Sequence, residues 1–174
     1  MRSARAALLA FALIGAACRH VPPPPAFVPL PLPRLADCPG SLVPTHDLEG
    51  DWVIHERIRV RAGEIDEAYG LVVQKTGPRL VLIALTPFGA TAFRLTQIGV
   101  EVWSESKLGP ALPVPPENVL RDLHRAHFLA TDDPAFEGRS LQRNRDGSIL
   151  VSAPACGYEA TLVPVSVVNP AATD

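Results

Sequence analysis

The sequence predicts an α+β domain in which a curved antiparallel sheet covers at least one helix. Five strand-like segments follow one another between residues 50 and 106, with only short loops between them. One stretch of helical periodicity comes next, and a pattern typical of a hairpin ends the domain. Strands joined by short loops pair antiparallel, whereas parallel strands need a long crossover, so the pattern favours a meander.

Residues 1–17 have the pattern of a removable secretory signal peptide. Arg2 and Arg5 precede an uninterrupted small and apolar run from Ala6 to Ala17. A positive start followed by a short apolar run is typical of an export signal, and the run is too short to span a bilayer well. The sequence therefore predicts export from the cytoplasm.

Cys18 is the candidate for lipidation. The three residues before it, Gly15 to Ala17, resemble the lipobox of bacterial lipoproteins, although a leucine usually stands where Gly15 does. Several acyl chains such as palmitate would anchor the protein durably. Arg19 is not the aspartate that marks inner-membrane retention in enterobacterial lipoproteins, so this resemblance implies the periplasmic face of the outer membrane. A soluble periplasmic protein cleaved at an Ala-x-Ala-like site and a retained anchor are the alternatives.

Residues 18–47 are predicted to form a proline-rich tether behind the lipidated cysteine. The stretch RHVPPPPAFVPLPLP excludes a regular helix or a central strand. It favours an extended polyproline II spacer that holds the domain away from the membrane.

Two further cysteines remain if Cys18 carries a lipid. Cys38 and Cys156 would then form a disulfide in an oxidising periplasm, and this bond would link the entry of the domain to its last hairpin. Two separate buried thiols are the alternative.

The folded domain is predicted over residues 48–168, with a tail at residues 169–174. Residues 50–63 alternate between an apolar and a polar face, which is typical of a half-buried antiparallel strand. Four further strands follow, with the sequences AYGLVVQKTG, RLVLIALTPFG, ATAFRLTQIG and VEVWSES.

A helix is predicted from Pro116 to Phe128. Proline suits the first helical turn, and Glu117 lies near the positive end of the helix. The stretches SILVSAP and YEATLVPVSVV then indicate a final hairpin, with Gly157 near its turn.

The sequence predicts neither an enzyme nor a cofactor. It contains no G-x-S-x-G elbow, phosphate-binding loop or zinc cysteine cluster. His124 and His127 are three residues apart on the predicted helix, but no third metal ligand is evident, so no metal site is predicted. The net charge of −2 and the absence of a basic block argue against nucleic acid as a partner.

The most prominent chemical feature is the number of apolar side chains. The stretch LVLIAL is apolar on both faces, and such a strand must be covered on both. A packed core and an apolar cavity for an acyl or polyene chain both fit this pattern. The candidate cavity residues are Leu82, Leu85, Phe93, Leu95, Trp103, Leu120 and Leu123.

Two long stretches resemble a known family. The run LVLIALTPFGATAFRLTQIGVEVWSES, followed by LPVPPENVLRDLHRAHF, resembles an uncharacterised family of bacterial outer-membrane lipoproteins, domain of unknown function 3261. That family is similar in architecture to the lipoprotein carriers LolA and LolB, which are incomplete antiparallel barrels with helices over an apolar cavity. The resemblance implies a half-barrel that binds lipid-like molecules, although one helix is predicted here where the carriers have several.

Two functions are expected from these observations. The first is an outer-membrane lipoprotein that binds or transfers a lipid-like, acyl or polyene molecule, with the membrane and envelope transport or biosynthesis proteins as partners. The alternative is a non-catalytic scaffold lipoprotein with a solid core, which holds a partner complex at the membrane.

Overall fold

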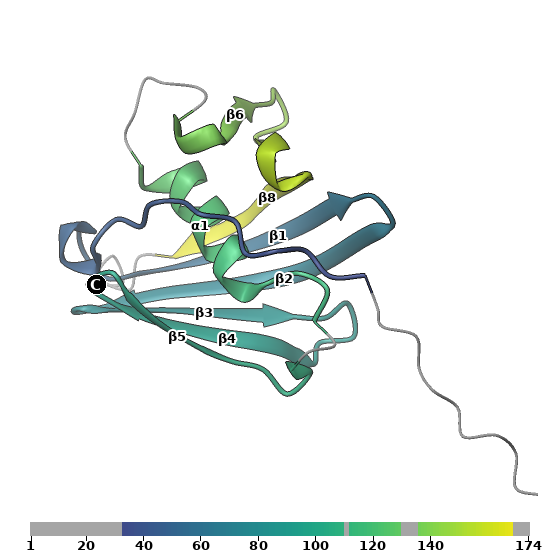
Figure 1. Cartoon of the computed structure of the whole chain (residues 1–174). Coiled ribbons are helices and arrows are strands. Elements are labelled where there is room, and N and C mark those ends of the chain that lie inside the picture. Colours follow the sequence, from purple (N-terminus) through teal and green to yellow (C-terminus); the bar gives the residue numbers. More distant parts are fainter. Residues whose placement is uncertain (1–32, 110–111, 130–135, 169–174) are drawn as a thin grey trace, which may run out of the picture. The chain divides into compact units, whose positions relative to one another are not determined.

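The computed structural model describes residues 33–109, 112–129 and 136–168, and these described residues belong to one compact unit. The signal peptide at 1–17, the candidate lipidation site Cys18 and the tail at 169–174 lie outside the described residues. Eight strands and one α-helix make up the regular structure of the described part (Figure 1). The strands are β1 (Trp52–Ala62), β2 (Ile65–Thr76), β3 (Arg79–Leu85), β4 (Thr91–Ile98), β5 (Glu101–Glu105), β6 (Ser140–Arg143), β7 (Ile149–Ala153) and β8 (Tyr158–Val168).

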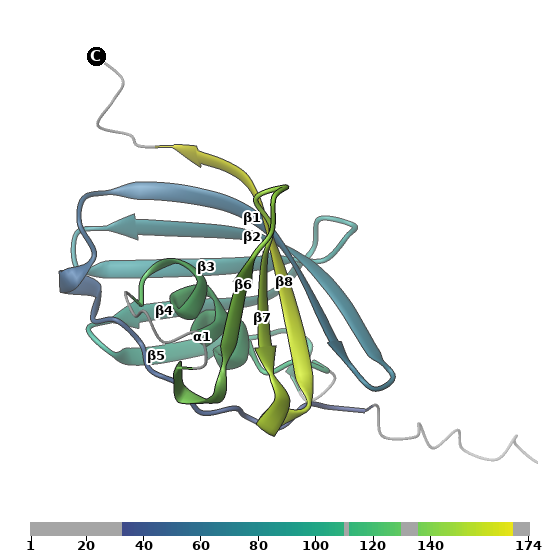
Figure 2. The same cartoon turned by 90° about the horizontal axis from the view of Figure 1, so that it is seen from above.

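All eight strands belong to one antiparallel sheet. Their order is β5-β4-β3-β2-β1-β8-β7-β6, so β1 to β5 form the expected meander and β8 joins the last strands to β1. Figure 2 shows β6, β7 and β8 turned away from the direction of β3 to β5, which gives the sheet a concave side. The antiparallel sheet with a helix is thus confirmed, whereas β6 is a strand that the sequence analysis did not predict.

The alternating sequence of β1 explains how this strand lies in the sheet. Ile58 and Val60 point into the core, while Arg57, Arg59 and Arg61, which alternate with them, are exposed. The pairing of β1 with β8 changes register between His55 and Glu56, and an irregularity of this kind bends a strand.

The helix α1 (Pro116–His127) lies on the concave side of the sheet, between β3–β5 and β6–β8 (Figure 2). Proline at the first helical position and Glu117 in the first turn mark its start, as predicted. Leu120 and Leu123 are buried in the apolar core, but Asn118, Asp122 and other polar side chains of α1 are buried as well.

Residues 33–47, named here the strap, cross over α1 on the side away from the sheet (Figure 1). The backbone N–H of Cys38 donates to the Asn118 side chain, and the strap ends in a short 3₁₀ turn, η1 (Thr45–Asp47). The folded unit therefore includes residues that the sequence assigned to the tether, because the strap supplies hydrogen bonds to the otherwise uncovered face of α1. None of the helices in the described part is long and apolar enough to cross a membrane.

Candidate functional site

The space between the sheet and α1 is the first candidate site, because five of the predicted cavity residues meet there. Leu82, Phe93 and Leu123 are 0 % exposed, and Leu95 and Leu120 are 1 % exposed. A void that could hold a water molecule would leave the side chains around it accessible, so these five residues line no such void. In this structure they form a packed core.

The other two predicted cavity residues lie on the opposite face of the sheet. In β3, Leu85 comes directly after Ala84, whose side chain is buried. Trp103 of β5 lies opposite Thr96 of β4, and Thr96 comes directly after the buried Leu95. Successive side chains of a strand point to opposite faces, and Trp103 is accordingly 50 % exposed. The sequence analysis named all seven as candidate lining residues of one cavity, but the structure places Leu85 and Trp103 on the face of the sheet away from α1.

A buried polar cluster lies at one side of α1. Asp122 accepts hydrogen bonds from the Tyr158 hydroxyl at 2.9 and 3.0 Å, and the Arg139 Nε lies 3.2 Å from its Oδ1. Loss of water raises the pKa of Asp122 to about 7, because Arg139 and Tyr158 offset this loss only in part. The same burial, together with the Asp122 charge, raises the pKa of Tyr158.

The same arginine links α1 to the strap. Arg139 donates from one guanidinium nitrogen to the Pro39 carbonyl and from another, at 3.1 Å, to the Cys38 carbonyl. Cys38 in turn forms a disulfide with Cys156, in the turn between β7 and β8. The strap is therefore joined covalently to the sheet and by hydrogen bonds to the cluster beside α1.

A second polar cluster joins α1, β4 and the strap. His124 Nδ1 accepts the backbone N–H of Val43 at 3.0 Å, so its Nε2 carries the proton and donates to the Gln97 Oε1 at 2.8 Å. The Gln97 amide donates to the carbonyls of Val43 and Gly99. Burial lowers the pKa of His124 to about 4, and the imidazole is neutral near pH 7.

The contributions of Asp122 and His124 to the stability of the fold should change with pH in opposite directions. The contribution of Asp122 to stability is present below about pH 4 and is lost as the pH rises through about 7. The contribution of His124 is present above about pH 6.5 and is lost as the pH falls through about 4. Urea unfolding between about pH 4 and pH 7 measures both effects. As the pH rises, the free energy of unfolding is expected to fall more steeply in H124Q than in the wild type. In D122N it is expected to rise more steeply than in the wild type. Identical pH profiles for the two variants would contradict these assignments.

A third polar contact lies at the last turn of α1. His127 Nε2 is 2.8 Å from Oε1 of Glu56, whose side chain is almost fully buried under the helix. Trp52 packs against Phe128 just beyond, with ring centroids 5.4 Å apart. The Glu56–His127 contact lies within ion-pair distance but lacks hydrogen-bond geometry, so neither carboxylate oxygen of Glu56 nor the His127 Nε2 has a hydrogen-bond partner among the described residues. His124 and His127 thus have different partners, and no cluster of three or more metal-ligating side chains occurs in the described part of the chain.

Comparison with protein families connects this domain to other proteins. The model of a family described as protein of unknown function DUF3261 matches residues 54–147, a little over half of the chain. The chain belongs to the DUF3261 family. Comparison with curated proteins gives no match.

The matched part of this DUF3261 protein contains most of the polar contacts of α1. It runs from β1 through α1 to the turn after β6, and it includes Gln97, Asp122, His124 and Arg139. The strap, β7 and β8 lie outside it, and with them the disulfide and Tyr158.

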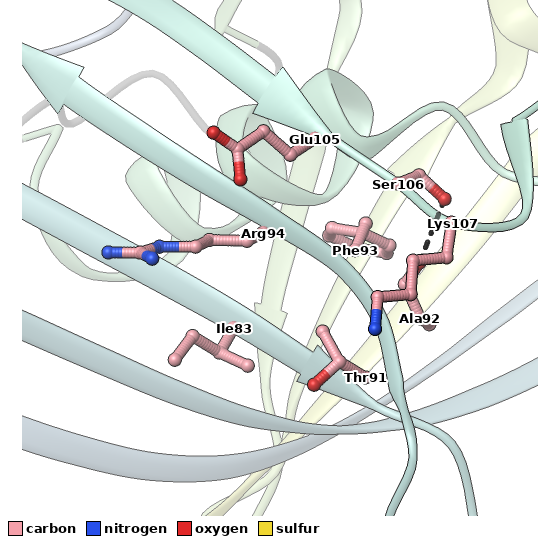
Figure 3. Close-up of a pocket in the computed structure, with 8 residues that line it drawn as sticks. All are labelled: Ile83, Thr91, Ala92, Phe93, Arg94, Glu105, Ser106 and Lys107. Atoms are coloured by element: carbon pink, nitrogen blue, oxygen red, sulfur yellow. Dashed lines mark hydrogen bonds between the residues drawn. The ribbon is translucent and has the colours of Figure 1, made fainter.

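The outer face of the DUF3261 domain has a depression of about 410 Å³ near the ends of β4 and β5 (Figure 3). Arg94 and Glu105 lie on one side of it, and Thr91 and Lys107 lie on the other. These four side chains are exposed, and the dashed contact in Figure 3 joins the Ser106 hydroxyl to the Ala92 carbonyl at 2.8 Å. The charged side chains around this depression are therefore in contact with solvent.

Sequence reasoning missed the residues that hold α1 in place. The sequence analysis assigned no role to Arg139 or Asp122. One signal was available for Gln97, because it lies two residues after Leu95 and so shares its inward face. A polar residue at an inward strand position indicates a buried hydrogen-bond network.

Proposed function

We propose that this protein is a lipid-anchored, non-catalytic scaffold of the outer membrane, with a solid domain that holds a partner protein at the periplasmic face. One observation carries this proposal. The side chains that would line a cargo cavity are 0–1 % exposed where they meet α1, so the concave side of the sheet is filled by the protein itself. A domain without internal space acts through its surface and its position.

The contacts of α1 support a helix that stays in place. The disulfide, the Asp122–Arg139 pair and the His124–Gln97 hydrogen bond connect α1 and the strap to three different parts of the sheet or its loops. Removing one partner of a buried ion pair alone costs about 3–5 kcal/mol. A ligand that displaced α1 would have to compensate several such losses together.

The anchoring and location rest on the sequence. The apolar run before Cys18 and the small residues next to it support lipidation, and the absence of an aspartate after Cys18 supports the outer membrane. A disulfide between Cys38 and Cys156 is in keeping with an oxidising compartment such as the periplasm.

Mass spectrometry of the intact protein tests the scaffold against a carrier. The protein purified from membranes in mild detergent is expected to have the mass of the mature chain plus the acyl groups on Cys18. The matched control C18S is expected in the soluble periplasmic fraction, with the mass of the chain alone. A further acyl or polyene chain bound in stoichiometric amount to both proteins would contradict the scaffold.

A lipid carrier is the second candidate, and one observation favours it. Much of what holds α1 is polar, whereas the inward face of the sheet beneath it is apolar, with Leu71, Val73 and Leu80 buried there. A withdrawn α1 would expose this face to an acyl or polyene chain, as the resemblance to LolA and LolB implies. In that case the partners would be envelope transport or biosynthesis proteins.

A further inference from the structure

Phe88 is the most exposed large apolar side chain of the described residues, at 96 %. It lies at the tip of the hairpin between β3 and β4, in the uncharged sequence Thr86-Pro87-Phe88-Gly89-Ala90. The backbone N–H of Thr86 donates to the carbonyl of Ala90, and the backbone N–H of Gly89 donates to the carbonyl of Thr86, so the tip is a closed turn. Gly89 has a φ of 79°, which an L side chain rarely adopts. The turn therefore holds the ring of Phe88 outward in water.

A second apolar side chain projects at the same end of the sheet. Leu108 follows β5 and is 46 % exposed, next to Lys107. Its backbone N–H donates to the Ser106 hydroxyl, which in turn donates to the Ala92 carbonyl at the start of β4. The β3–β4 hairpin and the last residue of β5 share one end of the sheet because β4 runs antiparallel to both its neighbours. This end is named here the tip end.

The described chain begins at the tip end as well. The backbone N–H of Leu35 donates to the Pro113 carbonyl at 2.8 Å, five residues after Leu108. The two views agree that the strap starts at this end and runs toward η1 at the other (Figures 1 and 2). Residues 19–32 connect this point to Cys18, and an extended polyproline II chain of that length reaches about 45 Å. The lipid anchor therefore joins the domain at the end that carries Phe88 and Leu108.

We propose that the tip end contacts the bilayer, with Phe88 inserted among the acyl chains and Leu108 at the boundary with the headgroups. This inference rests on the proposed anchoring through Cys18. The tether limits the distance between the tip end and the membrane to about 45 Å, so a weak contact is favoured by a raised effective concentration. The domain then lies against the membrane, whereas the sequence analysis expected the tether to hold it away. Phenylalanine and leucine side chains of membrane-bound surfaces bury at the boundary between headgroups and acyl chains, and removal of one large apolar side chain from water is favourable. The proposal gives the scaffold a fixed orientation, with η1 and the β4–β5 turn directed away from the membrane.

The opposite end of the sheet supplies a matched control. Val100 lies in the β4–β5 turn and is 58 % exposed, so it is also an apolar side chain at a hairpin tip. Cys18 is lipidated in the anchored protein, and Cys38 and Cys156 form a disulfide. A cysteine introduced at residue 88 or 100 is then the reactive thiol for an environment-sensitive NBD dye.

The experiment compares full-length lipidated F88C and V100C, each labelled with NBD, on vesicles of phosphatidylethanolamine and phosphatidylglycerol. NBD at residue 88 is expected to shift to shorter wavelength and to be quenched by brominated acyl chains, while NBD at residue 100 keeps its emission in water. Equal, water-like emission at both positions, in protein that floats with the vesicles, would overturn the inference and leave the anchoring intact. Protein that does not float would overturn the anchoring and this inference together.

Discussion

Replacing Cys38 and Cys156 together by alanine is expected to lower the free energy of unfolding by about 4–5 kcal/mol. The two cysteines are 118 residues apart in the sequence, so the disulfide closes most of the folded unit into one loop. In the chain-entropy account, a loop of this length restricts the unfolded chain by an amount near that figure. The midpoint of thermal unfolding is expected to fall by roughly 10–20 °C.

Unfolding with and without reductant provides the control for this prediction. Dithiothreitol should destabilise the wild type as much as the double alanine replacement does, and it should leave the double variant unchanged. A loss below about 1 kcal/mol in both experiments would mean that the strap contributes little to stability, against the loop-closure account.

Replacing Arg139 by methionine is expected to cost about 3–5 kcal/mol. Methionine keeps much of the length of the arginine, so the loss comes from the polar contacts. The substitution leaves Asp122 buried without its cation and leaves the carbonyls of Cys38 and Pro39 without these donors. Urea unfolding near pH 8, above the raised pKa of Asp122, measures the effect where the carboxylate is charged.

Two further variants separate the lost ion pair from general damage. R139M/D122N is expected to recover part of the loss, because it removes the uncompensated charge while Tyr158 keeps an oxygen to which it can donate. Arg79 is exposed on β3, and R79M is expected to change the stability by less than about 0.5 kcal/mol. Equal losses in R139M and R139M/D122N would show that the ion pair is not the source of the effect.

The regular elements were accessible from the sequence because each has a strong local signal. The alternation around Arg57 and Ile58 predicted β1, and Pro116 with Glu117 marked the first turn of α1. β6 has no such signal, because only Leu141 among its four residues is apolar and none is fully buried. Its strand conformation comes from pairing with β7, which no local pattern reveals.

The face on which a side chain lies was harder to predict where both faces are apolar. In β3, Leu82 and Leu85 are equally apolar, and only their separation by an odd number of residues places them on opposite faces. The register shift between Ala84 and Leu85 adds a local irregularity that the sequence does not mark.

Whether the interior is hollow or filled was beyond the sequence for a different reason. The same leucines line a cavity or form a core, depending on how closely α1 approaches the sheet. That approach depends on contacts between distant residues, such as His124 with Val43 and Arg139 with Cys38, about 80 and 100 positions apart. Pairs at such distances leave no periodic pattern in one sequence.

Native-state hydrogen exchange of α1 with the disulfide intact is the most direct test of a filled and closed interior. The account predicts that the amides of Leu120 and Leu123 exchange only through global unfolding, with the same free energy of opening as those of Leu82 and Leu95 in the sheet. Exchange of the α1 amides at a clearly lower free energy than the sheet amides would contradict it. That result would mean that the helix leaves the sheet while the rest of the domain stays folded.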